Sequence, residues 1–330
     1  MKMAVRVALI GCGELARDYY APAFRRLAKE GAAVLAACCD CDEDKSRAYA
    51  VETGFEKSYS DVKRMIRESG PDCMLIATPV TVTAKTAADL SRFCIPMMIE
   101  KPPALNAVDG ELLKQALQKN GVLHQIAFNR HYMPLIRELK SRLKVSGDIQ
   151  NVQVLMSRYR RTEPTFYTTA IHSVDLARYL AGAPYEKVRI SYQSLPQYGG
   201  GVDNIFMDCR FKNGVSGQVS TLVCSGTVNE RVMVTCDDRS FFARLPVWGC
   251  SDCPGTLEVH EQGLPVSVKS GREISDGPGA SEMNGFYAEI RGFLQAVESG
   301  RQPEESMEYA MQAVKIGECI NNRMNEFEED

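Results

Sequence analysis

The stretch Val5-Arg6-Val7-Ala8-Leu9-Ile10 is followed directly by Gly11-Cys12-Gly13-Glu14-Leu15-Ala16, and this junction decides the fold. The first six residues are typical of a buried strand, and the next six form a G-x-G-x-x-A turn that opens an amphipathic helix. Gly11 permits the tight turn, Gly13 lets a pyrophosphate approach the backbone, and Ala16 allows helix and strand to pack closely. Because a helix N-terminus also attracts anions, the stretch predicts a Rossmann-type domain that binds a dinucleotide.

The chain as far as residue 128 repeats this alternation of strand and helix, which is the βαβ signature of a parallel sheet covered on both faces. Apolar runs predict five strands, at residues 5–10, 33–39, 73–77, 97–99 and 122–128. Apolar residues at three- and four-residue intervals predict five helices, at residues 15–29, 43–53, 61–69, 81–93 and 107–120. Residues 1–128 are therefore predicted to form an α/β Rossmann domain with a doubly wound parallel sheet.

The pattern changes after about residue 150 to longer alternating stretches, which are typical of antiparallel strands. They cover residues 151–161, 188–195, 204–211, 216–224 and 230–236, and Asn213-Gly214 is a hairpin signal. Helices are expected at residues 169–180, 281–299 and 304–324, with loop and short strand at residues 250–279. Residues 129–330 are therefore predicted to form an α+β domain, with a large, open, mainly antiparallel sheet flanked by helices.

The composition is that of a globular protein: 330 residues, 45% hydrophobic and 25% charged, with a formal net charge of -3. The chain has no basic excess for nucleic acid, no apolar run of about 18–20 residues for a membrane span, and no signal-peptide pattern. The 12 cysteines lie mostly in apolar runs of a long chain, where cysteine acts as a small hydrophobe. We expect a cytoplasmic protein without disulfides, and no metal at the lone pair Cys250 and Cys253.

Asp40 ends the second predicted strand, 27 residues after Gly13 (40 minus 13). A carboxylate at this place accepts hydrogen bonds from ribose hydroxyls. The alternative role, an N-cap for the next helix, suits Asp42 better because it stands immediately before Glu43. No arginine directly follows Asp40 to receive a 2′-phosphate, so NAD is favoured over NADP.

Glu100-Lys101-Pro102 follows another predicted strand, at the edge of the sheet where open α/β folds bind ligands. A lysine there can reach cofactor and substrate together, whereas its ordinary role would be that of a solvated loop charge. Three further segments complete the set of motifs: Ala77-Thr78-Pro79, Asn129-Arg130-His131-Tyr132-Met133-Pro134 and His172-Ser173-Val174-Asp175-Leu176.

With these motifs the chain resembles, over essentially its whole length, the Gfo/Idh/MocA family of NAD(P)-dependent oxidoreductases, which includes glucose-fructose oxidoreductase and inositol dehydrogenase. The resemblance implies that residues 129–330 form a substrate-binding and oligomerisation domain, with homodimers or homotetramers formed through the large sheet. The expected cofactor-binding residues are Gly11, Cys12, Gly13, Glu14, Leu15, Asp40, Thr78, Pro79, Glu100 and Lys101.

Lys101 and His172 are the candidate catalytic residues. Lysine would polarise the substrate oxygen, and histidine, whose pKa lies close to working pH, would take the hydroxyl proton while hydride leaves the same carbon. The candidates to bind substrate are Asn129, Tyr167, Thr168 and Asp175. His172 as a core histidine and Asp175 as a solvated charge stay open as alternatives. Arg158 and Arg160 alternate along a predicted strand and could meet an anionic substrate, although a surface or interface role is favoured.

Thr168 departs from the family, because many members carry an aspartate four residues before the histidine. The substrate of inositol or glucose enzymes therefore does not transfer directly. The leading hypothesis is an oxidoreductase that transfers a hydride between NAD and a secondary alcohol or carbonyl of a sugar, polyol or sugar derivative. The alternatives are a non-catalytic NAD(H)-binding sensor or scaffold protein on the same fold, which the lost aspartate favours, and an NAD-dependent glycosidase.

Overall fold

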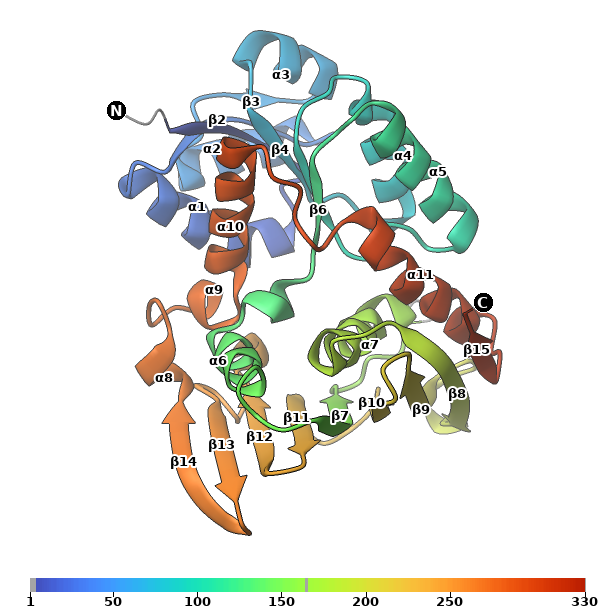
Figure 1. Ribbon diagram of the computed structural model, residues 1–330. Coiled ribbons are helices and arrows are strands. Elements are labelled where there is room, and N and C mark those ends of the chain that lie inside the picture. Colours follow the sequence, from blue (N-terminus) through green and yellow to red (C-terminus); the bar gives the residue numbers. More distant parts are fainter. Residues whose placement is uncertain (1–3, 164–165, 330) are drawn as a thin grey trace. The chain divides into compact units, whose positions relative to one another are not determined.

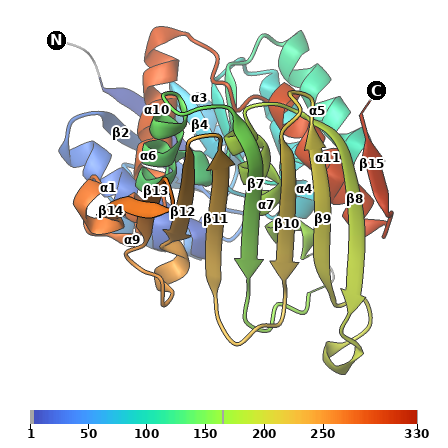
Figure 2. The ribbon, with the colours of Figure 1, turned by 60° about the horizontal axis from the view of Figure 1, so that its bottom comes forward.

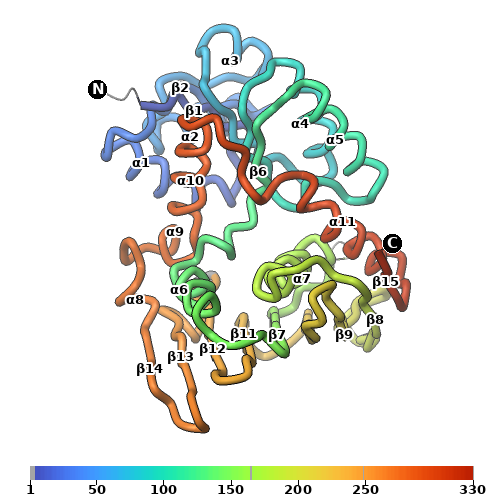
Figure 3. The backbone as a smooth tube through the Cα atoms, in the orientation of Figure 1, coloured from blue at the N-terminus to red at the C-terminus, as the bar shows by residue number. Residues whose placement is uncertain are grey.

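The computed structural model describes residues 4–163 and 166–329 and divides the chain into two compact units. The first unit contains the described residues of Met1–Asn129 together with Phe286–Val314. The second contains those of Arg130–Gly285 and Lys315–Asp330. The sequence analysis predicts a domain boundary after residue 128 and a single domain for residues 129–330. In the structure, the chain returns to the first unit at residue 286 (Figure 3).

The first unit is built on a six-stranded sheet of order β3-β2-β1-β4-β5-β6 in which all strands run parallel. Its strands are β1 (Val5–Ile10), β2 (Ala33–Cys39), β3 (Ser58–Tyr59), β4 (Cys73–Ile76), β5 (Met97–Glu100) and β6 (His124–Ala127). The predicted parallel sheet is confirmed. The two-residue strand β3, which the sequence did not indicate, adds to the five expected strands.

Helices cover both faces of this sheet, with α1 and α10 on one side and α4 and α5 on the other (Figure 1). The helices are α1 (Ala21–Lys29), α2 (Glu43–Thr53), α3 (Val62–Ser69), α4 (Val80–Ser91), α5 (Ala107–Lys119), α10 (Phe286–Ser299) and the start of α11 (Met307–Asn321). The predicted N-cap is confirmed, because the Asp42 side chain accepts hydrogen bonds from the backbone N–H groups of Asp44 and Lys45.

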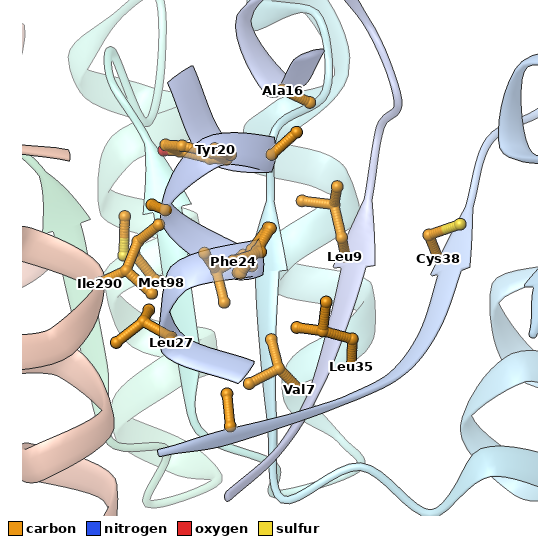
Figure 4. Packing of buried hydrophobic residues seen from close by; sticks show 14 of the residues in the cluster. Val7, Leu9, Ala16, Tyr20, Phe24, Leu27, Leu35, Cys38, Met98 and Ile290 are labelled. Carbon is orange, nitrogen blue, oxygen red and sulfur yellow. The ribbon is translucent and has the colours of Figure 1, made fainter. Parts of the chain in front are cut away.

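The core of the first unit lies between the sheet and the pair α1 and α10 (Figure 4). Val7 and Leu9 of β1 face Phe24 and Leu27 of α1, and Ile290 of α10 closes the same cluster. All five side chains are removed from solvent. Since burying such a side chain contributes about 1.5–3 kcal/mol, this cluster fixes the helix that follows the glycine turn against the first strand.

The second unit is built on a nine-stranded sheet of order β14-β13-β12-β11-β7-β10-β9-β8-β15. Neighbouring strands are antiparallel except for β7 and β10, which run parallel, so the predicted mainly antiparallel sheet is confirmed. The strands are β7 (Ile149–Ser157), β8 (Tyr185–Ser194), β9 (Asp203–Phe211), β10 (Ser216–Leu222), β11 (Asn229–Cys236), β12 (Arg239–Leu245), β13 (Thr256–Glu261), β14 (Leu264–Ser270) and β15 (Glu326–Glu328).

Helices α6 (Pro134–Leu143) and α7 (Tyr167–Ala181) pack on one face of this sheet, and Figure 2 shows the other face. Val152, Val154 and Met156 of β7 are buried on the helix side, while Gln153 and Leu155 alternate with them. Short helices α8 (Gly271–Ile274) and α9 (Ala280–Met283) follow the β14 hairpin. Among the described residues, no helix is both long and apolar enough to cross a membrane.

Candidate functional site

The turn after β1 has the backbone that a phosphate-binding loop requires. Gly11 has φ +98°, and a Cβ on it would clash with the carbonyl oxygen of Ala77, which follows β4. Only glycine fits there, because the loops after β1 and β4 approach each other at the point where the strand order reverses. A Cβ at Gly13, in contrast, would meet no protein atom within 4 Å. Protein packing therefore does not demand glycine at residue 13, and the open space above it fits the approach of a pyrophosphate.

Asp40 is bonded to this turn. Its Oδ2 accepts a hydrogen bond of 2.8 Å from the backbone N–H of Cys12, and its Oδ1 accepts one of 3.0 Å from that of Asp42. Partial burial opposes the charge, but these hydrogen bonds hold the pKa of Asp40 below its ordinary value. The half-buried carboxylate is therefore ionised and fixed beside the turn, in position to accept hydrogen bonds from a ribose.

Thr78 and Pro79 lie where the chain passes from β4 into α4. The hydroxyl of Thr83, in the first turn of that helix, donates to the carbonyl oxygen of Thr78 or Pro79 at 3.0 and 3.1 Å. Thr83 is buried by this arrangement. It therefore holds the loop after β4 in shape against the neighbouring glycine turn.

Glu100 ends β5 and organises the segment that carries Lys101. Its Oε1 accepts a hydrogen bond from the hydroxyl of Tyr20, and its Oε2 accepts one of 3.1 Å from the backbone N–H of Lys101. The peptide bond between Lys101 and Pro102 is cis. Burial and the negative charge of Glu100 raise the pKa of Tyr20 well above its ordinary value, so this tyrosine remains a neutral donor. Glu100 therefore links the hydroxyl of Tyr20 to the main chain at Lys101.

His172 lies on α7 in the second unit and is buried. Its Nε2 is 3.0 Å from Nη1 of Arg130, and Arg130 binds Glu230 of β11 through Nε at 3.2 Å and Nη2 at 2.7 Å. Arg158 binds the same carboxylate. Although burial favours the neutral acid, the two guanidinium groups lower the pKa of Glu230 to about 2.

The prediction of a surface or interface role for Arg158 is wrong. Strand β7 ends at Ser157, and the Arg158 side chain turns inward to Glu230, leaving the residue 3% exposed. Arg160 is exposed and lies beyond the end of the strand, so the two arginines do not share a strand face. Burial of a charged side chain is tolerated here because an opposite charge accompanies it.

Asp175 is buried one turn after His172 on α7, so its alternative role as a solvated charge is wrong. Its Oδ2 is 2.8 Å from Nε2 of His131, whose ring stacks on that of Tyr179 with centroids 3.8 Å apart. Helix α7 therefore makes two different contacts that involve a histidine. His172 of the helix contacts the guanidinium of Arg130, and Asp175 of the helix contacts the ring of His131.

The remaining candidates for substrate binding also have defined places. Tyr167 is buried at the start of α7, and burial raises its pKa. It lines a hollow of about 240 Å³ in the second unit, together with Arg161 and Arg323. Thr168 is half-buried on the same turn. Asn129 is buried and is the last residue of the first unit before the chain passes to the second.

The structure thus brings the ten predicted cofactor-binding residues together in the first unit, at the carboxyl ends of β1, β2, β4 and β5. Tyr167, Thr168, His172 and Asp175 lie together on α7 of the second unit. Among the described residues, no group of three or more His, Cys, Asp or Glu side chains is arranged to hold a metal ion.

Comparison with known proteins identifies this combination of units. Residues 5–128 match the family described as "Oxidoreductase family, NAD-binding Rossmann fold", and residues 142–242 match the "GFO/IDH/MocA C-terminal domain". The chain belongs to the Gfo/Idh/MocA family. It is accordingly an NAD(P)-dependent oxidoreductase.

Three similar known proteins cover between 66% and 99% of the chain. Myo-inositol 2-dehydrogenase of Thermotoga maritima is 23% identical, over 98% of this chain and 97% of that protein. The scyllo-inositol 2-dehydrogenase (NAD(+)) of Bacillus subtilis is 26% identical, over 66% of this chain and 67% of its own length. The solved structure of levoglucosan dehydrogenase with NADH and levoglucosan has a TM-score of 0.84 at 18% identity and covers 99% of both chains.

The sequence analysis does not propose a functional role for three polar residues of this Gfo/Idh/MocA protein: Tyr20, Arg130 and Glu230. Tyr20 follows Ala16 by four residues and therefore shares the helix face that packs on the sheet, which could have indicated an inward hydroxyl. Arg130 stands inside a quoted motif, but its partner Glu230 is 100 residues away along the chain. No local pattern indicates that pairing.

Proposed function

We propose that this protein is an NAD-dependent dehydrogenase or reductase that acts on CH–OH groups of a sugar, polyol or sugar derivative. The observation that carries the proposal is the turn around Gly13, where open space lies beside a fixed, ionised Asp40. Relatives named for inositols and for levoglucosan support the substrate class.

The residues have distinct roles in the proposed reaction. NAD, when bound, supplies or accepts the hydride at C4 of its nicotinamide. Lys101, whose main chain is held by Glu100, would polarise the substrate oxygen. His172 would contact the same oxygen as it gains or loses its proton. Asn129, Tyr167, Thr168 and Asp175 are the residues proposed to orient the substrate.

A panel of sugars, polyols and sugar acids, followed by cofactor fluorescence, tests this proposal. Oxidation of bound NADH by a carbonyl compound, or reduction of NAD by an alcohol, is the expected result. A protein that binds NADH yet is inert to the whole panel would instead be a sensor or scaffold. Release of a sugar from a glycoside without net change in NADH would identify a glycosidase.

The first prediction concerns cofactor choice and follows from Asp40. A 2′-phosphate about 4 Å from this carboxylate would cost about 4 kcal/mol at an effective dielectric constant near 20. NAD should therefore bind at least about tenfold tighter than NADP, as titration calorimetry can measure. Asp40→Ser should reduce the difference between the dissociation constants of NAD and NADP. Asp44→Ser, which removes the same charge from the exposed first turn of α2, should not. Equal dissociation constants for the two cofactors would refute the role of Asp40.

The second prediction concerns assembly. The face of the large sheet that Figure 2 shows carries a hollow of about 560 Å³, lined in part by Leu155, Met233 and Phe242. We propose that a second copy covers this face, giving a homodimer or homotetramer. Light scattering should give at least twice the chain mass of 36.6 kDa. Phe242→Glu should shift the protein toward monomer, and Val51→Lys, on an exposed face of α2, should not. A wild-type monomer at micromolar concentration would contradict the proposal.

A further inference from the structure

Four buried side chains of the second unit form a continuous chain of contacts that ends on His172. Arg158 binds Glu230, Glu230 accepts two hydrogen bonds from Arg130, and Arg130 directs Nη1 at Nε2 of His172 at 3.0 Å. Arg130 is only 1% exposed, and three of its nitrogens are engaged in these contacts. Its guanidinium therefore has a fixed orientation relative to the ring.

The partner of the ring decides which ring nitrogen carries the hydrogen. A guanidinium has five N–H donors, no acceptor, and stays protonated in proteins. In a hydrogen bond with Arg130, Nε2 of His172 must therefore be the acceptor, and it cannot carry a hydrogen itself. We infer that Arg130 holds His172 as the neutral Nδ1–H tautomer, so that its Nε2 is not available as a base.

A second histidine of the chain provides an internal reference. His124 has Nδ1 2.8 Å from the carbonyl oxygen of Val122, and its Nε2 accepts a 3.0 Å hydrogen bond from the backbone N–H of Met307. It is therefore held in the same Nδ1–H tautomer.

The consequence for catalysis rests on the proposed function, whereas the tautomer rests on the contacts alone. In the proposed oxidation, the C–H bond of the alcohol gives hydride to the nicotinamide, and the O–H proton must pass to a base. Nε2 of His172 is engaged with Arg130, and Nδ1 already carries a hydrogen. His172 therefore does not take this proton while its contact with Arg130 holds.

Histidine-selective ¹⁵N labelling and long-range ¹H–¹⁵N correlation spectra test the inference, because the chain contains four histidines. At about pH 8, where an ordinary histidine is neutral, the unprotonated nitrogen of His172 should be the one that couples to both ring C–H hydrogens, which is Nε2. His124 should show the same pattern. His172→Gln and His260→Gln assign the signals. A protonated Nε2 on His172, in either the neutral or the cationic ring, would overturn the inference.

Variants distinguish the effect of Arg130 on the ring of His172 from a general disturbance of the second unit. Arg130→Met should abolish the single Nδ1–H pattern of His172, and Arg130→Lys, which retains donor N–H groups, should preserve more of it. Arg158→Met disturbs the same ion-pair cluster but leaves the contact between Arg130 and His172, so the pattern should survive. Persistence of the pattern in Arg130→Met would contradict the role of Arg130. Because these spectra need no substrate, a protein that turns over no compound would refute the proposed function but not this inference.

Discussion

Lys101→Ala should lower turnover by roughly a hundredfold or more, the usual effect of removing a positioned acid-base group. The backbone N–H of Lys101 is bound by Glu100, so the substitution removes the amine without releasing the main chain. The turnover number at saturating substrate, determined with the most active compound of the panel, measures the loss. Lys85→Ala is the matched control, because it removes the same charge from an exposed position on α4.

The same loss is expected for His172→Ala, with one difference that separates catalysis from cofactor binding. His172 belongs to the second unit, whereas the glycine turn and Asp40 belong to the first, so NADH affinity should barely change. A less than threefold loss of turnover in both variants would refute their catalytic roles. If wild type binds NADH but turns over no compound of the panel, the dehydrogenase proposal gives way to the sensor.

The first unit could be predicted closely because its determinants are local. The strand, the glycine turn and the helix follow one another within about 25 residues, and each depends on its own pattern of apolar residues and glycines. Asp40 was also predictable, since parallel strands bring their carboxyl ends to one edge of the sheet. Its hydrogen bond to Cys12 shows how the second strand end contributes to the turn of the first.

The buried charges of the second unit were not predictable in this way. An arginine beside a strand is assigned to solvent because burial without a partner is costly. The partner of Arg158 is Glu230, 72 residues later, and it lies nearby only because β11 pairs with β7 so that Glu230 stands opposite Met156. Strand register of this kind depends on the whole sheet. The sequence contains both residues but no local sign that they meet.

The final helices show a related limit. An amphipathic pattern at residues 281–299 predicts that the helix has an apolar face, but not which sheet that face covers. Phe286, Ile290 and Phe293 of α10 pack into the core of the first unit, although more than 150 residues of the second unit separate them from it along the chain. Packing against α1 and the residue before it selects this partner, as the rings of Tyr20 and Phe286 illustrate with centroids 5.7 Å apart.

Glu230→Ala should lower the free energy of unfolding by about 3–5 kcal/mol, because it leaves two buried guanidinium groups without their carboxylate. Urea unfolding followed by circular dichroism measures this loss. The control is Glu261→Ala, which breaks an ion pair with Arg239 near the protein surface and should cost no more than about 1 kcal/mol. The triple variant Glu230→Leu, Arg130→Met and Arg158→Met replaces all three charged side chains by apolar ones. It should lower the free energy of unfolding by less than Glu230→Ala alone, since no unpaired charge remains.

The pH dependence of this loss identifies its electrostatic origin. The folded protein holds the pKa of Glu230 at about 2, below the ordinary value of 4.5. A carboxyl group whose pKa is lowered by folding stabilises the protein above its unfolded pKa and loses that contribution as pH falls through the folded value. The difference in unfolding free energy between wild type and Glu230→Ala should therefore be constant from pH 7 to about pH 5 and shrink below about pH 4.5. A difference that stays unchanged down to about pH 3, or that is below about 1 kcal/mol at pH 7, would show that the ion pairs of Glu230 do not stabilise the second unit.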